Sequence, residues 1–334
     1  MEKTRVGVIG LGGIAQLIHL PLLSKLPNIE LAGVAEINKN RLKIVSDKFQ
    51  IKNCFTDYLE MMNKCEMDAV VIATPTNTHA EIALECINSK KHVLIEKPVA
   101  RTLKETKEIY SAAIKNKAVA MVGMNLRFRP DAMLMKSLVN SGELGELFYI
   151  KCGWLRKQSS EQKWFLNKSQ SGGGVIIDLG ILILDLAVWM FGDVQPLSVS
   201  VQKYNHNTKE VEDSAVGIIK FENEKVVMFE VSWGLHSEDD SFKLTAYGTK
   251  GTAKLNPLRA YRRLATTTID YTPAKTTNTN NLFRKSYDNE LKHFIAAIRQ
   301  DEHVVISSVK EAMDRMKLLE AIYKSAESQK EIKI

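Results

Sequence analysis

The chain has 334 residues, of which 45% are hydrophobic, and a formal net charge of +7. This apolar share is enough for one large or two ordinary cores. The basic residues are spread along the chain without a nucleic-acid-binding motif, so we expect a solvated basic surface and no nucleic-acid partner. The four cysteines lack any C-x-x-C pair, which argues against a disulfide framework and a metal site; they are Cys54, Cys65, Cys86 and Cys152.

Neither export nor membrane insertion is expected. The sequence starts with MEKTRVGVIG, which leads into a strand pattern without the basic and apolar regions of an export signal, so we expect a cytoplasmic protein. Residues 175–191 are nearly all apolar, but a membrane span needs ~20 such residues, and this stretch contains Asp178 and Asp185. We therefore predict a buried helix there and no membrane partner.

Short apolar strands alternate with amphipathic helices through the first half of the chain. We expect strands at 5–9, 30–35, 69–73 and 92–95, and helices from the first glycine-rich turn to about residue 26 and at 39–49, 79–89 and 103–116. This alternation predicts a parallel sheet with right-handed crossovers. In such sheets, ligands bind beyond the carboxyl ends of the strands.

A glycine-rich turn follows the first strand and reads Gly10-Leu11-Gly12-Gly13-Ile14-Ala15. Gly10 permits a tight turn, Gly12 lets the backbone approach a pyrophosphate, and the next helix offers N–H donors to phosphates. Glu36 ends the second strand, at the usual distance for an acid that accepts hydrogen bonds from an adenosine ribose. The pattern predicts dinucleotide binding and favours NAD, although Lys39 and Arg41 keep NADP open.

Two later strands also end in polar loops, Thr74-Pro75-Thr76-Asn77-Thr78-His79 and Glu96-Lys97-Pro98. Each proline ends its strand and fixes the loop that follows. Lys97 stands at a strand's carboxyl end, beside the predicted nicotinamide position, and is a candidate proton carrier. The alternative is a surface lysine paired with Glu96.

The order and spacing of several motifs resemble the glucose–fructose oxidoreductase / inositol dehydrogenase / rhizopine catabolism (Gfo/Idh/MocA) family over nearly the whole chain. These motifs are 7–15, Thr74-Pro75 with His79, Glu96-Lys97-Pro98, 123–130 (GMNLRFRP), 142–146 (GELGE), 171–178 (SGGGVIID), Glu212-Asp213 and 248–251 (GTKG).

The resemblance implies an α/β Rossmann domain at 1–122, followed at 123–334 by an α+β domain with an open, mostly antiparallel sheet. Family members commonly form homodimers or homotetramers through that sheet. The second half agrees when it is read alone. We expect strands near 146–154, 197–202, 214–221, 226–233 and 242–247, and helices near 287–300 and 308–327.

The implied reaction is hydride transfer between a nicotinamide and a sugar, cyclitol or nucleotide-sugar alcohol or ketone. The resemblance assigns catalytic roles to Lys97 and Asp178. The expected cofactor-binding residues are Gly10, Gly12, Gly13, Ile14, Glu36, Thr74, Pro75, Asn77, His79, Glu96, Lys97 and Trp164. The expected substrate-lining residues are Asn125, Arg127, Leu182 and His236. No metal is expected.

The chain departs from the family pattern at two positions. The family helix usually reads Asp-x-Gly-x-His-x-x-Asp, but here Leu182 replaces the histidine, and leucine neither donates nor accepts a proton. In an α-helix, residues 178, 182 and 185 would project from one face. Phe165 stands where many relatives have an arginine beside the cofactor. Lys97 can act with Asp178 alone, or His236 or His206 can serve in place of the missing histidine. The alternative for each of these two is a loop histidine without a catalytic role, and this is the interpretation that we favour.

Three functions stay open on the sequence. The first is an NAD(P)-dependent dehydrogenase of sugar-like alcohols. The second is a reductase of an imine or a conjugated double bond, which suits the apolar Leu182. The third is a nucleotide-sensing regulator without turnover, against which the retained Lys97 and Asp178 argue.

Overall fold

The computed structural model describes residues 3–157, 163–234, 236, 238–273, 281–302 and 304–334, which fall into two compact units. The first unit contains residues 1–123 and 287–313, and the second contains 124–286 and 314–334. The first break lies beside the expected boundary at 122, but residues 287–313 pack with the first unit. The helical periodicity of residues 287–300 predicts an apolar face, but it does not indicate which of the two cores this face packs against.

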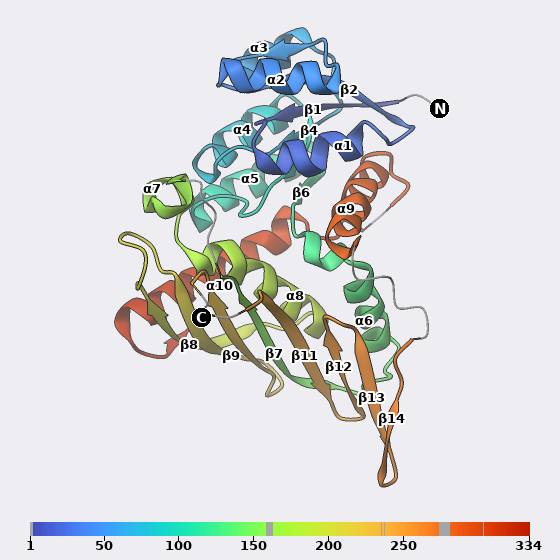
Figure 1. The fold of residues 1–334 in the computed structure, drawn as a ribbon, viewed down its shortest axis with the longest axis vertical. Helices are drawn as coiled ribbons and strands as arrows, with labels where there is room; N and C mark the ends of the chain where they lie inside the picture. Colours follow the sequence, from blue (N-terminus) through green and yellow to red (C-terminus); the bar gives the residue numbers. More distant parts are fainter. Residues whose placement is uncertain (1–2, 158–162, 235, 237, 274–280, 303) are drawn as a thin grey trace. The chain divides into compact units, whose positions relative to one another are not determined.

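The first unit contains a parallel sheet of six strands in the order β3-β2-β1-β4-β5-β6 (Figure 1). The strands are β1 (Thr4–Ile9), β2 (Ile29–Ala35), β3 (Cys54–Phe55), β4 (Ala69–Ile72), β5 (His92–Ile95) and β6 (Ala120–Val122). All four residues of β4 are buried, as expected for a parallel strand covered on both faces. The strand order reverses between β1 and β4, and ligands bind at such a switch point in open α/β sheets.

The helices of this unit follow the expected alternation. They are the π-helical segment η1 (Ala15–His19), α1 (Leu20–Leu23), α2 (Lys39–Phe49), α3 (Tyr58–Lys64), α4 (Thr76–Asn88), α5 (Leu103–Asn116) and α9 (Leu282–Ile298). Of these elements, β3, α3 and β6 were not expected from the sequence. The segment after α9 is tied to β6, because Val122 N–H donates to the Ser307 carbonyl at 2.8 Å.

The second unit contains a sheet of nine strands in the order β14-β13-β12-β11-β7-β10-β9-β8-β15. The strands are β7 (Leu147–Leu155), β8 (Pro196–Tyr204), β9 (Ser214–Phe221), β10 (Val226–Ser232), β11 (Ser241–Gly248), β12 (Gly251–Leu255), β13 (Arg259–Leu264), β14 (Thr267–Asp270) and β15 (Ile332–Lys333). Neighbouring strands are antiparallel except β7 and β10. The open, mostly antiparallel sheet is therefore confirmed, although β12 to β15 were not expected.

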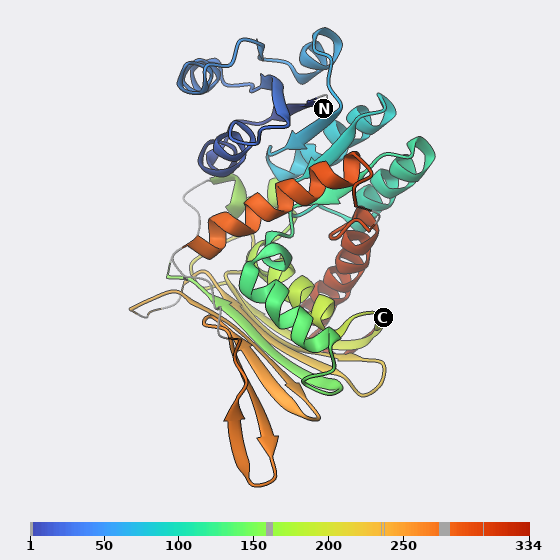
Figure 2. The same cartoon turned by 90° about the vertical axis from the view of Figure 1, so that its right-hand side faces the viewer.

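Helices cover one face of this nine-stranded sheet (Figures 1 and 2). The helical elements are η2 (Asn125–Phe128), α6 (Pro130–Asn140), η3 (Lys163–Leu166), α7 (Lys168–Ser171), η4 (Ile176–Gly180), α8 (Ile181–Phe191) and α10 (Val309–Ser328). By length and composition alone, the stretch Lys168–Phe191 can cross a membrane, but 89% of its most apolar window is buried inside the protein. The prediction of a buried helix at 175–191 is confirmed.

Asp185 on α8 anchors a buried ionic cluster. It is 1% exposed, and it accepts hydrogen bonds from Arg127 Nε at 2.7 Å and Arg315 Nε at 3.1 Å. Burial alone would raise the pKa of Asp185, but the charges and hydrogen bonds of the two arginines outweigh it and lower the pKa. The donors to Asp185 are thus guanidinium N–H groups of two arginines.

We predict that Asp185→Asn lowers the free energy of unfolding by about 3–5 kcal/mol, because it leaves buried guanidinium charge without its counter-ion. Glu60→Gln, which breaks the exposed pair with Lys64, is the control and should cost under ~0.5 kcal/mol. Since the folded pKa of Asp185 is depressed, its stabilisation is present above the unfolded pKa and is lost as the pH falls. Urea unfolding at several pH values measures both effects, and equal losses for the two variants would contradict the account.

Candidate active site

The glycine-rich turn has the geometry that a dinucleotide needs. Gly10 has a φ of +89°, and a Cβ there would lie 2.7 Å from the Ala73 carbonyl, so only glycine fits. A Cβ on Gly12 or Gly13 would meet no described protein atom within 4 Å, which leaves open space over the turn. Ala15 is fully buried where the helix packs on the sheet. The turn is thus closed against the protein at Gly10 and open for a ligand at Gly12.

Glu36 holds the glycine-rich turn from the end of β2. Its carboxylate accepts hydrogen bonds from Leu11 N–H at 2.9 Å, Asn38 N–H at 2.9 Å and Arg41 Nη1 at 3.3 Å. A carboxylate offers about four acceptor positions, so one position is left for a further donor such as a ribose hydroxyl. Glu36 also repels a 2′-phosphate, whereas the cationic Arg41 attracts one.

The loop after β4 packs against the glycine-rich turn. The Thr74 methyl group would lie 2.8 Å from a Cβ on Gly10, Pro75 precedes α4, and Asn77 is exposed in the first helical turn. His79 is 1% exposed, with Nε2 2.8 Å from the Thr74 carbonyl and Nδ1 2.8 Å from the Pro98 carbonyl. Burial lowers the pKa of His79. His79 therefore links two loops and has no ring nitrogen left for a ligand.

The Glu96-Lys97-Pro98 segment follows β5, and its Lys97–Pro98 peptide is cis. Glu96 is 7% exposed, and its Oε1 lies 2.7 Å from Nε2 of the fully buried His19. The Glu96 carboxylate thus points into the protein, whereas Lys97 is half-buried. One oxygen of Glu96 is engaged with His19, and the positive charge of Lys97 also acts on the Glu96 carboxylate.

These observations fit a bound dinucleotide. The ends of β1, β2, β4 and β5 meet at one edge of the sheet and bring together every expected cofactor-binding residue of the first unit. These are Gly10, Gly12, Gly13, Ile14, Glu36, Thr74, Pro75, Asn77, His79, Glu96 and Lys97. When bound, the cofactor supplies the hydride acceptor or donor.

Asp178 is the expected catalytic acid of the second unit. It is 9% exposed on the π-helical segment η4, and its Oδ2 accepts a hydrogen bond from the Trp233 indole Nε1 at 3.1 Å. Asp178 lies in this π-helical segment, whereas Leu182 and Asp185 lie in α8, so the α-helical spacing assumed for the three residues does not hold through residue 178. Asp178 and Asp185 accordingly bind different partners, Trp233 and the arginine pair.

The segment that carries Asp178 is fixed by Glu212. Its Oε1 accepts hydrogen bonds from Gly174 N–H and Ile176 N–H at 3.0 Å each, and from the Tyr323 hydroxyl at 2.9 Å. A Cβ on Gly174 would lie 2.0 Å from the Glu212 carbonyl, so the glycine allows this contact. The Glu212-Asp213 and SGGG motifs thus act together to place the start of the helix.

The remaining expected site residues of the second unit differ in burial and in their partners. Leu182 is 4% exposed, Asn125 is buried and donates to Ser286 Oγ, and the Arg127 guanidinium is engaged with Asp185. Trp164 is half-buried and stacks on Phe165 with ring centroids 3.9 Å apart. Because the Arg127 guanidinium is paired with Asp185 inside the protein, Arg127 fits a substrate-lining role less well than the other expected residues do.

The two histidines considered as substitutes lie in loops. His236 is exposed, and His206 is exposed and stacked on Tyr204 at 5.5 Å. The sequence analysis assigned no site role to His19, Trp233 or Glu290. Glu290 is the most visible of these omissions, because it occupies an apolar stripe with Tyr287, Leu291 and Phe294, and all four are buried.

Two family models cover nearly the whole chain. The model described as an oxidoreductase family with an NAD-binding Rossmann fold matches residues 4–124, and the model of the C-terminal alpha/beta domain of the same family matches residues 136–334. The chain belongs to the Gfo/Idh/MocA family of oxidoreductases. Its first domain is accordingly an NAD-binding Rossmann domain.

Relatives of this oxidoreductase span its full length. The D-glucoside 3-dehydrogenase of Escherichia coli is 26% identical over 97% of this chain and 95% of its own. The myo-inositol 2-dehydrogenase of Thermotoga maritima is 25% identical over 99% and 98%. A levoglucosan dehydrogenase crystallised with NADH has the same fold, with a TM-score of 0.90, 22% identity and coverage of 100% and 99%.

We predict that Gly12→Val weakens NADH binding by at least ~10-fold and leaves the melting temperature unchanged, because its side chain enters the space of the pyrophosphate. Gly10→Ala should lower the melting temperature, since the alanine is strained at φ +89° and clashes with Ala73. Calorimetric titration and thermal unfolding measure the two effects. Unchanged NADH binding by a folded Gly12→Val variant would refute this placement of the cofactor.

Proposed function

We propose that this oxidoreductase is an NAD-dependent dehydrogenase or reductase that transfers hydride between nicotinamide C4 and a carbinol or carbonyl carbon of a sugar, cyclitol or nucleotide sugar. The observation that carries the proposal is Lys97, which follows β5 at the same sheet edge as the glycine-rich turn. The named activities of the glucoside and inositol dehydrogenases support the substrate class. We also propose a cytoplasmic location, which the four free cysteines support.

Lys97 and Asp178 divide the proton chemistry in this proposal. In the oxidation direction, Lys97 binds the substrate hydroxyl and takes its proton as hydride leaves the same carbon. Asp178, oriented by the Trp233 indole, is the second polar group at the reacting alcohol. Lys97 belongs to the first unit and Asp178 to the second, and the pairing of their roles rests on the family resemblance.

The first test is a panel of sugars, inositols and nucleotide sugars, followed by nicotinamide absorbance. Lys97→Met should lower kcat by about 10²–10⁴, the range for loss of a general acid or base. Lys104→Met, at an exposed position of α5, is the matched control and should keep the wild-type rate. Tight NAD binding without turnover of any member of the panel would count against the proposal.

A second candidate reaction is favoured by Leu182. Its apolar side chain is 4% exposed on α8, where the family pattern has a histidine. An apolar wall suits a flatter substrate, such as an imine or a conjugated double bond. Leu182→His separates the two reactions, because a large rise in sugar oxidation would disfavour this second candidate.

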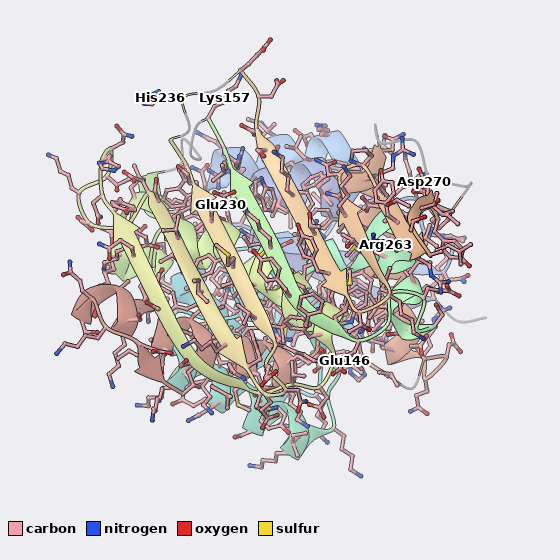
Figure 3. The ribbon with its side chains drawn as sticks, turned by 90° about the horizontal axis from the view of Figure 1, so that it is seen from below. Glu146, Lys157, Glu230, His236, Arg263 and Asp270 are labelled. Atoms are coloured by element: carbon pink, nitrogen blue, oxygen red, sulfur yellow. The ribbon has the colours of Figure 1, made fainter. Side chains whose placement is uncertain are left out.

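We also propose that the protein is a dimer or tetramer through the outer face of the nine-stranded sheet. Figure 3 looks onto this face from below, with the strands in front of the helices that cover the other face. Val216, Ile218 and Met228 expose 44%, 41% and 38% of their surface on this face. Glu230 lies over Gly153 on the same face, with the exposed Lys151 and Lys243 on neighbouring strands. Apolar groups with both signs of charge can pair with a second copy of the same face.

We predict that Ile218→Arg shifts the sedimenting species towards monomer, because a charge would be buried without a partner at the centre of the interface. Ile114→Arg, at a position 64% exposed on α5, is the control and should leave the assembly intact. Sedimentation velocity measures the species present. An unchanged assembly in the Ile218 variant would place the interface elsewhere.

A further inference from the structure

Three ionisable side chains gather behind the Lys97 segment in the first unit. His19 ends η1, Glu96 follows β5 directly, and Glu290 comes from α9. All three are buried, with exposures of 0%, 7% and 0%. Burying ionisable groups is costly unless they are paired. A functional reason for this cluster is therefore expected.

His19 pairs with the carboxylate of Glu96 at 2.7 Å. Burial alone would raise the pKa of Glu96, but the hydrogen bond and charge of His19, with the charges of Lys97 and His79, outweigh it and lower the pKa. The second oxygen of Glu96 lies 3.3 Å from the Lys97 N–H. One carboxylate therefore contacts both the helix after the glycine-rich turn and the backbone of Lys97.

Glu290 lies close enough to this pair for the charge of Glu96 to act on it. Tyr287, one helical turn earlier on α9, stands edge-on to the His19 ring with centroids 5.9 Å apart, and residues i and i+3 share a helix face. Among the described residues, neither carboxyl oxygen of Glu290 has a hydrogen-bond partner. Burial, followed by the negative charge of Glu96, raises the pKa of Glu290 well above its usual value.

We propose that His19 and Glu290 are positioning residues for Lys97. His19 holds Glu96 in its ionised form, and Glu290 remains a neutral acid beside Glu96. Two carboxylates that share a buried site cannot both ionise cheaply. The one paired with His19 keeps the charge, and the unpaired one keeps its proton. A single rotamer of Glu96 then fixes the peptide N–H of Lys97.

This inference deepens the proposed function and rests on it for the role of Lys97, but the protonation pattern can be tested without turnover. The titratable groups around the cluster are Tyr287 on α9, Lys97 next to Glu96, and His79, whose charge acts on Glu96. Of the two carboxyl groups in the cluster, Glu290 is the one that retains its proton above the pH at which an unfolded glutamate loses it, about 4.3.

The first experiment compares thermal unfolding of the wild type and Glu290→Gln between about pH 5 and 8. The folded pKa of Glu290 is raised, so the wild type loses stability as the pH rises above the unfolded pKa. Glutamine mimics the neutral acid and does not ionise, so the advantage of Glu290→Gln should grow with pH. Glu108→Gln, exposed on α5, is the matched control and should run parallel to the wild type.

The second experiment measures kcat and NADH affinity for His19→Gln. We expect kcat to fall by about 10-fold or more, because small misplacement of a catalytic group is costly, while the Kd for NADH changes by less than ~3-fold. Without the His19 charge, the pKa of Glu96 rises, so the acid limb of the kcat profile moves to higher pH. His92→Gln, at the opposite end of β5, is the control and should show neither change.

Each result decides one part of the proposal. Parallel pH–stability curves for the wild type and Glu290→Gln would overturn the neutral Glu290, whether or not the enzyme turns over any sugar. An unmoved acid limb for an active His19→Gln variant would overturn the positioning role of His19. Absence of sugar turnover in the wild type would refute the proposed function and leave the stability experiment to decide the cluster.

Discussion

The hydrogen bond from the Leu11 N–H to the Glu36 carboxylate is the contact on which the cofactor edge depends. It joins the turn after β1 to the end of β2, the two places where a dinucleotide would contact backbone and ribose. The parallel order β3-β2-β1-β4-β5-β6 then brings the loops after β4 and β5 to the same edge. Three acceptor positions of Glu36 are used within the protein, so its orientation is set before any ligand binds.

Buried, hydrogen-bonded polar side chains fix the chemistry-bearing segments in both units. In the first unit, Glu96 is held by His19, and His79 joins the loops at Thr74 and Pro98. In the second unit, Glu212 holds the segment that carries Asp178, and Trp233 orients the Asp178 carboxylate. Buried polar groups are favourable only when they are satisfied, so these networks tolerate few substitutions. Lys97 and Asp178, the two proposed catalytic groups, both lie next to these networks.

Much of the first unit was predictable, because strand ends, glycine-rich turns and helix periodicity are local signals. The strands at Ile29–Ala35 and His92–Ile95 and the helix Lys39–Phe49 appear within a residue of their expected bounds. The two-residue strands β3 and β15 are too short for a pattern, and all four residues of the edge strand β14 are exposed, so its sequence has no apolar alternation. The contacts of Glu96 with His19 and of Asp178 with Trp233 join residues 77 and 55 positions apart. Local spacing cannot reveal such pairs, nor the return of 287–313 to the first unit.

Calorimetric titration of the wild-type protein with NADH and NADPH tests the central claim most directly. The account predicts binding of NADH, with NADPH at least ~10-fold weaker, because Glu36 accepts from the ribose and repels a 2′-phosphate. Equal affinity for both coenzymes would mean that Arg41, and not Glu36, governs recognition at the adenosine ribose. Absence of heat with either coenzyme would contradict the assignment of the glycine-rich turn as the dinucleotide site.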